Sequence, residues 1–168
     1  MSAEPLSTLA TLAGTRLMAA GRMLVTAESC TGGWIAQAVT AIAGSSAWFE
    51  RGFVTYSNES KQELVGVTAA TLARFGAVSE ETAREMAAGA LAAGRGSVAL
   101  AVTGVAGPSG GTAEKPVGMV CFSWALRDGR PKSETRHFTG DRAAVRRQSV
   151  IRALQGLIEV LDEAGTQV

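Results

Sequence analysis

The sequence predicts a three-layer α/β/α sandwich with a mixed, mostly parallel five-stranded sheet at its centre. Three observations lead to this fold class. Short β-favouring runs alternate with segments whose apolar residues recur at helical spacing. The run Ser97–Thr103 (SVALAVT) is almost wholly apolar, as expected for a strand covered on both faces. A DGRP turn joins the last two runs, which predicts an antiparallel hairpin.

The helices are predicted from apolar residues at intervals of three and four positions, and several end at a glycine. In chain order they are Leu6–Ala20, Gly32–Ala43, Asn58–Val65, Ala69–Phe75, a helix from the cap Ser79 to about Ala93, and Asp141–Glu163. Glu80 and Glu81 follow Ser79 directly, where negative charge is favourable against the helix dipole.

The strands are predicted from β-branched and aromatic runs. They are Met23–Ala27, Trp48–Tyr56, Ser97–Thr103, Val117–Leu126 and Ser133–Phe138. Gly52 lies inside the second run, which indicates a β-bulge. No internal repeat, low-complexity segment or linker interrupts the pattern, so we expect residues 1–168 to form one domain.

The composition is that of an ordinary globular protein. Of the 168 residues, 46% are hydrophobic and 18% are charged, and the net charge is +1. This charge creates no global field for nucleic acid or an anionic membrane, and no apolar run approaches a membrane span. The amino terminus lacks a secretory signal pattern, so a cytoplasmic protein is expected. With two cysteines and one histidine, we expect no disulfide framework, no metal site and no cofactor.

Three polar loops follow predicted strands: AESCTGG, YSNESK and TGVAGPSGG. Ligands of open α/β sheets bind beyond the carboxyl ends of the strands. If the three strands are parallel, these loops meet at one edge of the sheet. This convergence predicts a binding or catalytic site there.

The first loop places Ser29 where a strand turns into a helix. The backbone N–H groups from Cys30 to Gly33 would be free to hold a developing oxyanion. The alternative is that Ser29 or Thr31 only caps the helix, which is the commoner role of such residues. The loop by itself leaves both interpretations open.

A serine nucleophile needs a base, and Lys61 in YSNESK is the candidate. Lysine acts as a base when burial lowers its pKa, and Tyr56 could pass the proton or orient the amine. The alternative is a solvated helix residue. His137 lies in a strand remote from these loops, and Cys30 as the nucleophile would lack a base for the same reason.

The third loop lacks the Gly-Lys-Ser/Thr ending of a P-loop. Its glycines would let backbone N–H groups approach a phosphate, although Gly-Pro loops are often only turns. Arg142 and Arg146 are four residues apart at the start of the last helix and would share a face. They could grip a phosphate, or form a solvated basic surface.

Several stretches together resemble the CinA carboxy-terminal domain family. They are TAESCTGG, AGSSAWFERGFVTYSNESK, GAVSEE, AVTGVAGPSGGTAEKPVG and FTGDRAAVRRQ, and they span nearly the whole chain in the family's order. Stand-alone members of the family are nicotinamide-nucleotide amidases. The resemblance implies hydrolysis of nicotinamide mononucleotide (NMN) to nicotinate mononucleotide and ammonia, as part of NAD recycling. It also implies a serine–lysine mechanism without a metal.

The resemblance also implies roles for individual residues. Ser29 would be the nucleophile, Lys61 its base, and Tyr56 an aid to proton transfer or a support for Lys61. The substrate site would be lined or supported by Glu28, Cys30, Thr31, Gly32, Gly33, Ser46, Asn58, Thr103, Gly104, Gly107 and Arg142. We expect a homo-oligomer, with a dimer as the working expectation. Two alternatives stay open: a serine–lysine amidase for another small substrate, and a nucleotide-binding module without catalysis.

Overall fold

The computed structural model describes residues 4–166. Along the chain its elements are α1 (Glu4–Ala20), β1 (Leu24–Glu28), α2 (Trp34–Thr40), the 3-10 turn η1 (Ser45–Ala47), β2 (Phe49–Val54), α3 (Asn58–Val65), α4 (Ala69–Phe75), α5 (Glu80–Ala93), β3 (Val98–Gly104), β4 (Met119–Leu126), β5 (Lys132–His137) and α6 (Arg142–Gly165). Within this part of the chain, no helix is both long and apolar enough to cross a membrane.

The five strands form one sheet in the order β2-β1-β3-β4-β5. β1 pairs in parallel with both β2 and β3, whereas β4 runs antiparallel to β3 and to β5. Four strands therefore point the same way and β4 points the other way. The predicted mixed sheet, with its hairpin at one side, is confirmed.

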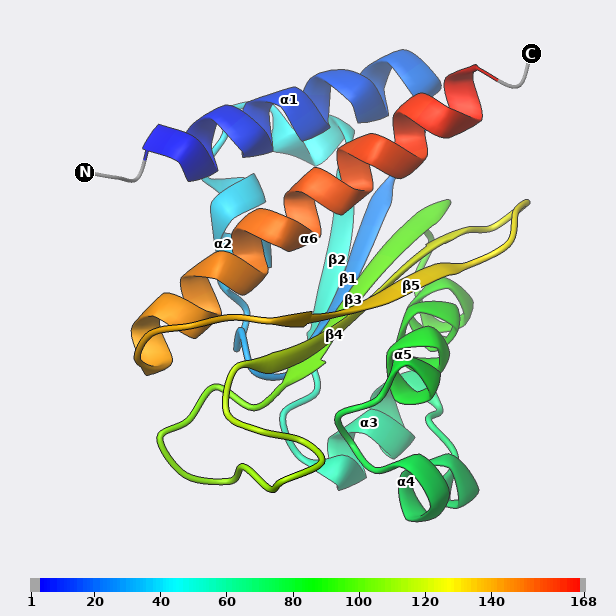
Figure 1. The fold of residues 1–168 in the computed structure, drawn as a ribbon. Helices are drawn as coiled ribbons and strands as arrows, with labels where there is room; N and C mark the ends of the chain where they lie inside the picture. Colours follow the sequence, from blue (N-terminus) through cyan, green and yellow to red (C-terminus); the bar gives the residue numbers. More distant parts are fainter. Residues whose placement is uncertain (1–3, 167–168) are drawn as a thin grey trace.

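Helices cover both faces of this sheet, which gives the predicted three layers (Figure 1). α1, α2 and α6 cover one face, and α3, α4 and α5 lie on the other. Successive side chains of the central strand β3 point alternately to these two faces. Its residues Val98, Leu100 and Val102 belong to the core under α1 and α6, whereas Ala99 and Ala101 face α5. The small side chains let the alanine-rich α5 lie close to the sheet.

Two local expectations are corrected by the structure. The second helix begins at Trp34, because Gly32 and Gly33 have φ angles of 59° and 100°, which L-residues in a helix do not adopt. The bulge in β2 falls at Glu50, because Leu24 pairs with Phe49 and Val25 pairs with Arg51.

Gly52 has a different role in β2. It pairs regularly with Thr26, and a Cβ atom there would lie 2.7 Å from the Thr26 hydroxyl and 3.4 Å from the Ala36 methyl group. Glycine at this position therefore allows the close packing of β2 against β1 and α2.

The connections open a crevice at the carboxyl ends of the parallel strands. The loop after β1 leads to α2 on one face, and the loop after β2 leads to α3 on the opposite face. Neighbouring strands whose connections diverge in this way leave a space for a ligand between their loops. The crevice lies at the predicted edge of the sheet.

The packing of α6 on Trp124 supplies a test of the fold. A Cβ atom at Gly156 would lie 2.0 Å from the Trp124 ring, whose Nε1 donates a hydrogen bond to the Ala153 carbonyl. We expect Gly156→Ala to lower the free energy of unfolding by about 1–3 kcal/mol despite the better helix propensity of alanine.

The matched control is Gly165→Ala in the same helix, where a Cβ atom would have no neighbour within 4 Å. It should be neutral or slightly stabilising. Urea unfolding of both variants measures the difference. Equal stability of the two variants would contradict this account of the α6 interface.

Candidate active site

The crevice brings Ser29 and Lys61 into direct contact. Ser29 directly follows β1, and Lys61 lies in the first turn of α3, whose start is capped by the Ser57 hydroxyl accepting the Ser60 amide. The Nζ atom of Lys61 lies 2.9 Å from the Oγ atom of Ser29. Lys61 is 1% exposed and Ser29 is 7% exposed. Both groups are therefore largely withdrawn from water.

Two backbone carbonyls hold the buried amine of Lys61. Its Nζ atom donates to the carbonyl of Thr55 at 2.9 Å and to that of Tyr56 at 3.2 Å. Within residues 4–166, no carboxylate lies within ion-pair distance of this amine. Burial without a countercharge lowers the pKa of Lys61 from its ordinary value of 10.5. The site therefore favours the neutral amine, which can accept a proton.

Glu28 organises the turn that carries Ser29. Its buried carboxylate accepts the Thr31 hydroxyl at 2.6 Å and the amides of Ile35 and Ala36 at 2.8 and 3.0 Å. Burial raises the pKa of Glu28, and these donors oppose that rise. Glu28 thus satisfies the second and third amides of α2, while neither the Ser29 nor the Thr31 side chain caps this helix.

Cys30 is adjacent to Ser29 but has a different electrostatic setting. Burial raises the pKa of its thiol to about 12. The thiol is therefore protonated near neutral pH, whereas nucleophilic cysteines have lowered pKa values.

Ser29 and Lys61 open onto a cavity of about 360 Å³. It is lined by Ser29, Cys30, Tyr56, Asn58, Lys61, Ala77, Val78, Thr103, Gly104, Val105, Ala106, Gly107, Ser109, Gly110 and Arg142. Across its mouth, Arg142 donates to the Gly107 carbonyl at 2.8 Å and to the Tyr56 hydroxyl at 3.2 Å. The loops after β1, β2 and β3 therefore meet at one site, together with the start of α6.

The model of the CinA C-terminal domain family matches residues 6–161. The chain belongs to this family. A curated relative from Escherichia coli strain K12, "Nicotinamide-nucleotide amidohydrolase PncC", is 54% identical over 94% of this chain and 95% of its own length. A protein of the same name from Pseudomonas putida is 52% identical over 94% of this chain and 98% of its own. The crystal structure of the competence/damage inducible protein CihA from Agrobacterium tumefaciens has a TM-score of 0.90 at 48% identity, covering 94% and 96% of the two chains.

Some residues expected at the substrate site lie elsewhere in this CinA-family domain. Glu28, Thr31, Gly32 and Gly33 build the turn behind Ser29 without lining the cavity. Ser46 belongs to η1, which precedes β2 and so lies at the opposite edge of the sheet. The structure does not bring Ser46 to the cavity.

The structure also adds residues that sequence analysis did not single out. The Thr55 carbonyl holds Lys61, and Ser109 lines the cavity from within the glycine-rich loop. Arg146, which the sequence paired with Arg142 as a possible phosphate-binding group, instead donates to the Cys30 and Thr31 carbonyls and does not line the cavity. Ala77 and Val78 line the cavity from the connection before α5, and their apolar side chains carry no signal in the sequence.

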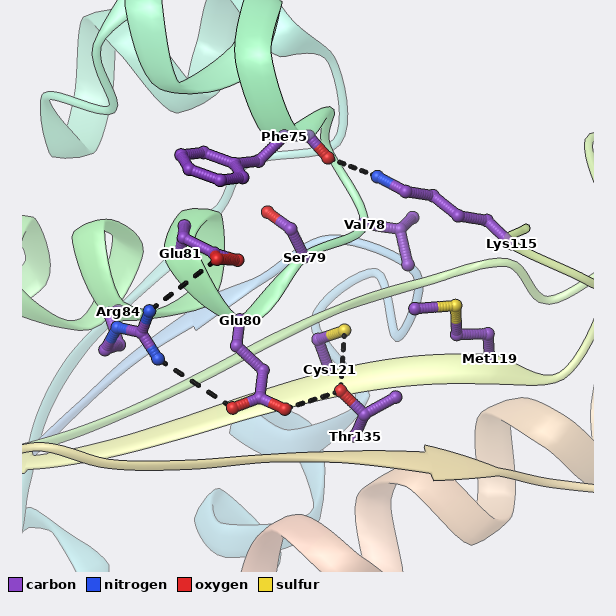
Figure 2. A pocket seen from close by; sticks show the side chains of 10 residues that line it. All are labelled: Phe75, Val78, Ser79, Glu80, Glu81, Arg84, Lys115, Met119, Cys121 and Thr135. Carbon is purple, nitrogen blue, oxygen red and sulfur yellow. Dashed lines mark hydrogen bonds and ion pairs between the residues drawn. The ribbon is translucent and has the colours of Figure 1, made fainter.

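A second cavity, of about 480 Å³, lies next to the first, with Val78 in both walls (Figure 2). Its polar groups bind one another: the Glu80 carboxylate accepts the hydroxyls of Ser133 and Thr135 at 2.9 and 2.7 Å, and Lys115 donates to the Phe75 carbonyl. These groups are already satisfied, and the contact between Ser29 and Lys61 lies in the first cavity. The described residues contain no group of three or more His, Cys, Asp or Glu side chains placed to hold a metal ion.

The buried Lys61 predicts a pH-dependent difference in stability. Its pKa is lowered from 10.5 in the folded chain and returns to the ordinary value on unfolding. Between these two values the unfolded chain binds more protons, so the free energy of unfolding of the wild type rises with pH. Lys61→Met lacks this dependence. We therefore expect the Tm of the wild type minus that of Lys61→Met to increase from about pH 7 to about pH 10.

Circular dichroism melts across this pH range measure the difference. Ser29→Ala is the matched control because it keeps the buried lysine, and its Tm should follow the pH dependence of the wild type. Parallel curves for the wild type and Lys61→Met would mean that Lys61 keeps its ordinary pKa in the folded chain.

Proposed function

We propose that this chain is a nicotinamide-nucleotide amidase that converts NMN and water to nicotinate mononucleotide and ammonia through an acyl-enzyme on Ser29. Family membership and the name shared by both curated relatives support the substrate. The contact between Ser29 and Lys61 supports the chemistry. The product is a pyridine nucleotide, so the reaction belongs to NAD recycling.

The observation that carries this proposal is the 2.9 Å contact between Lys61 Nζ and Ser29 Oγ. A neutral amine has two N–H bonds and one lone pair. In the structure Lys61 Nζ donates to Ser29 Oγ, and the Ser29 hydroxyl donates to the Tyr56 carbonyl at 3.5 Å. When Lys61 is neutral, the carbonyls of Thr55 and Tyr56 can keep its two N–H groups, and its lone pair is then available to the hydroxyl proton of Ser29. The lowered pKa of Lys61 increases the share of this neutral form.

The steps follow from this arrangement. Ser29 Oγ attacks the carboxamide carbon while its proton passes to Lys61 Nζ. The protonated Lys61 then gives that proton to the departing nitrogen, which leaves as ammonia, and Ser29 carries a nicotinoyl ester. Water attacks this ester with Lys61 again accepting a proton, and release of the acid returns the hydroxyl to Ser29.

Tyr56 contributes in two places. Its backbone carbonyl holds the base, and its phenol hydroxyl accepts from Arg142 at the cavity mouth. We infer that Tyr56 supports Lys61 through its carbonyl and helps to orient Arg142 through its side chain. The exposed guanidinium of Arg142 and the glycine-rich loop are then the groups that recognise the substrate phosphate.

The first test is ammonia release from NMN by the purified protein. We expect turnover by the wild type and by Cys30→Ala, and none by Ser29→Ala, since Cys30 holds a protonated thiol beside the nucleophile. Activity in Ser29→Ala together with an inactive Cys30→Ala would mean that Cys30, and not Ser29, is the nucleophile.

The same assay separates the alternatives. Ammonia release from other carboxamides in preference to NMN would indicate a serine–lysine amidase with a different substrate. Binding of NMN without turnover, also after the pH is raised to favour the neutral form of Lys61, would indicate a binding module.

The second test concerns the phosphate. A charge-assisted contact contributes about 1.5–3 kcal/mol, which corresponds to roughly 10- to 150-fold in specificity. We expect the wild type to prefer NMN strongly over nicotinamide riboside, and Arg142→Ala to lose most of this preference while its riboside activity changes little.

Arg95→Ala is the matched control, because Arg95 is an exposed arginine before β3 at the opposite edge of the sheet. Its preference should equal that of the wild type. A full preference in Arg142→Ala would assign phosphate recognition to the loop amides alone.

A further inference from the structure

The tetrahedral intermediate of the proposed reaction carries a negative oxygen, and the turn after β1 offers few free donors for it. The Ser29 amide donates to the Val102 carbonyl at 2.9 Å, and the Gly32 amide donates to the Ser29 carbonyl at 3.0 Å. The Trp34 amide donates to the Thr31 carbonyl, and Glu28 accepts the amides of Ile35 and Ala36. Cys30 lines the cavity, and in the part of the chain that the structure describes its amide donates to no backbone carbonyl and interacts only with its own thiol. This amide is therefore the donor next to the nucleophile.

Arg146 lies behind this turn. From the first turns of α6, its Nε atom donates to the Cys30 carbonyl at 3.0 Å and its Nη2 atom donates to the Thr31 carbonyl at 3.2 Å. Its guanidinium also lies over the Trp34 ring, 5.5 Å from the ring centroid. Two carbonyls and an aromatic face thus hold the Arg146 guanidinium in place. Arg146 does not line the cavity.

We propose that Arg146 is a positioning residue that strengthens the Cys30 amide as the oxyanion donor through a relay of peptide groups. Arg146 binds the Thr31 carbonyl, whose peptide carries the Gly32 N–H. That N–H donates to the Ser29 carbonyl, whose peptide carries the Cys30 N–H. Each hydrogen bond polarises the next peptide, so the charge of Arg146 increases the donor strength at the cavity wall. The inference rests on Ser29 being the nucleophile.

The local sequence fits this relay. Gly32 has a φ of 59°, which favours glycine in this turn, and a Cβ atom there would be in ordinary contact with Arg146 Nη2 at 3.5 Å. Arginine binds both carbonyls at once because its N–H groups form a rigid planar fork, whereas lysine presents a single point charge. The free thiol of Cys30 takes no part in the relay, which uses only its backbone.

The test compares kcat with binding. Removing an oxyanion donor outright costs about 100- to 1000-fold in kcat, so weakening one should cost about 10- to 100-fold. We expect Arg146→Met to show this loss in kcat with little change in KM or in the dissociation constant of nicotinate mononucleotide, the product. Arg146→Lys should recover part of the loss. The pH profile of kcat/KM should keep its midpoint, because Arg146 does not contact Lys61.

Arg127→Met is the matched control for a purely structural effect. The Arg127 guanidinium also binds two backbone carbonyls, those of Leu91 and Gly96, but it follows β4 at the opposite edge of the sheet. Both variants should lose thermal stability, and only Arg146→Met should lose kcat. Unchanged kcat in Arg146→Met, or equal losses of kcat in both variants, would overturn the proposal.

A fluorophosphonate probe tests the relay without NMN. Ser29 Oγ bonds to phosphorus, fluoride leaves, the hydroxyl proton passes to Lys61, and the phosphoryl oxygen occupies the oxyanion position. Labelling of Ser29 should slow about 10- to 100-fold in Arg146→Met and stay unchanged in Arg127→Met. Failure of the wild type to hydrolyse NMN, with this labelling difference intact, would reject the proposed substrate and keep the relay. Equal labelling rates in the wild type and Arg146→Met would reject the relay alone.

Discussion

The site depends on a lysine amine that is buried beside a serine hydroxyl without a countercharge. Taking an ammonium group out of water is unfavourable, so Lys61 gains a lowered pKa at the expense of stability. Three features of the fold make this arrangement possible. The Ser57 cap fixes the start of α3, the Thr55 and Tyr56 carbonyls receive the N–H groups, and β1 delivers Ser29 to the free side of the amine.

The divergent connections of β1 and β2 explain why these groups meet. Each strand ends at the same edge, but the chain leaves β1 for one face and β2 for the other. The turn that carries Ser29 and the first turn of α3 therefore face each other across the crevice, and β3 closes its remaining side with Thr103 and the glycine-rich loop. The chemistry is carried by loops, and the rigid parallel strands set their spacing.

The sequence was sufficient to predict the order of the elements, the mixed sheet and the meeting of the three loops, because periodicity and turn residues are local signals. The shift of the bulge from Gly52 to Glu50 is set by pairing with β1, which the sequence of β2 does not contain. The sequence offered the hydroxyls of Ser29 and Thr31 as caps of α2, but the Glu28 carboxylate binds the amides of this helix. Which side chain does so depends on the tertiary structure, because it is set by the side chain that lies beneath α2. The contacts of Arg146 could be identified only from the tertiary structure. Its partners are backbone carbonyls, which every residue has, so the sequence carries no signal for them.

The contact of Arg146 with Cys30 spans 116 positions of the sequence. During synthesis, the turn with Ser29 therefore leaves the ribosome long before its partner on α6 has been translated. Ser29 and Lys61 are also translated long before Arg142 and Arg146, which lie at the start of α6. A nascent chain without α6 contains Ser29 and Lys61 but lacks the two arginines that contact the cavity mouth and the turn after β1. The order of translation thus delays the completed site until the whole domain can fold.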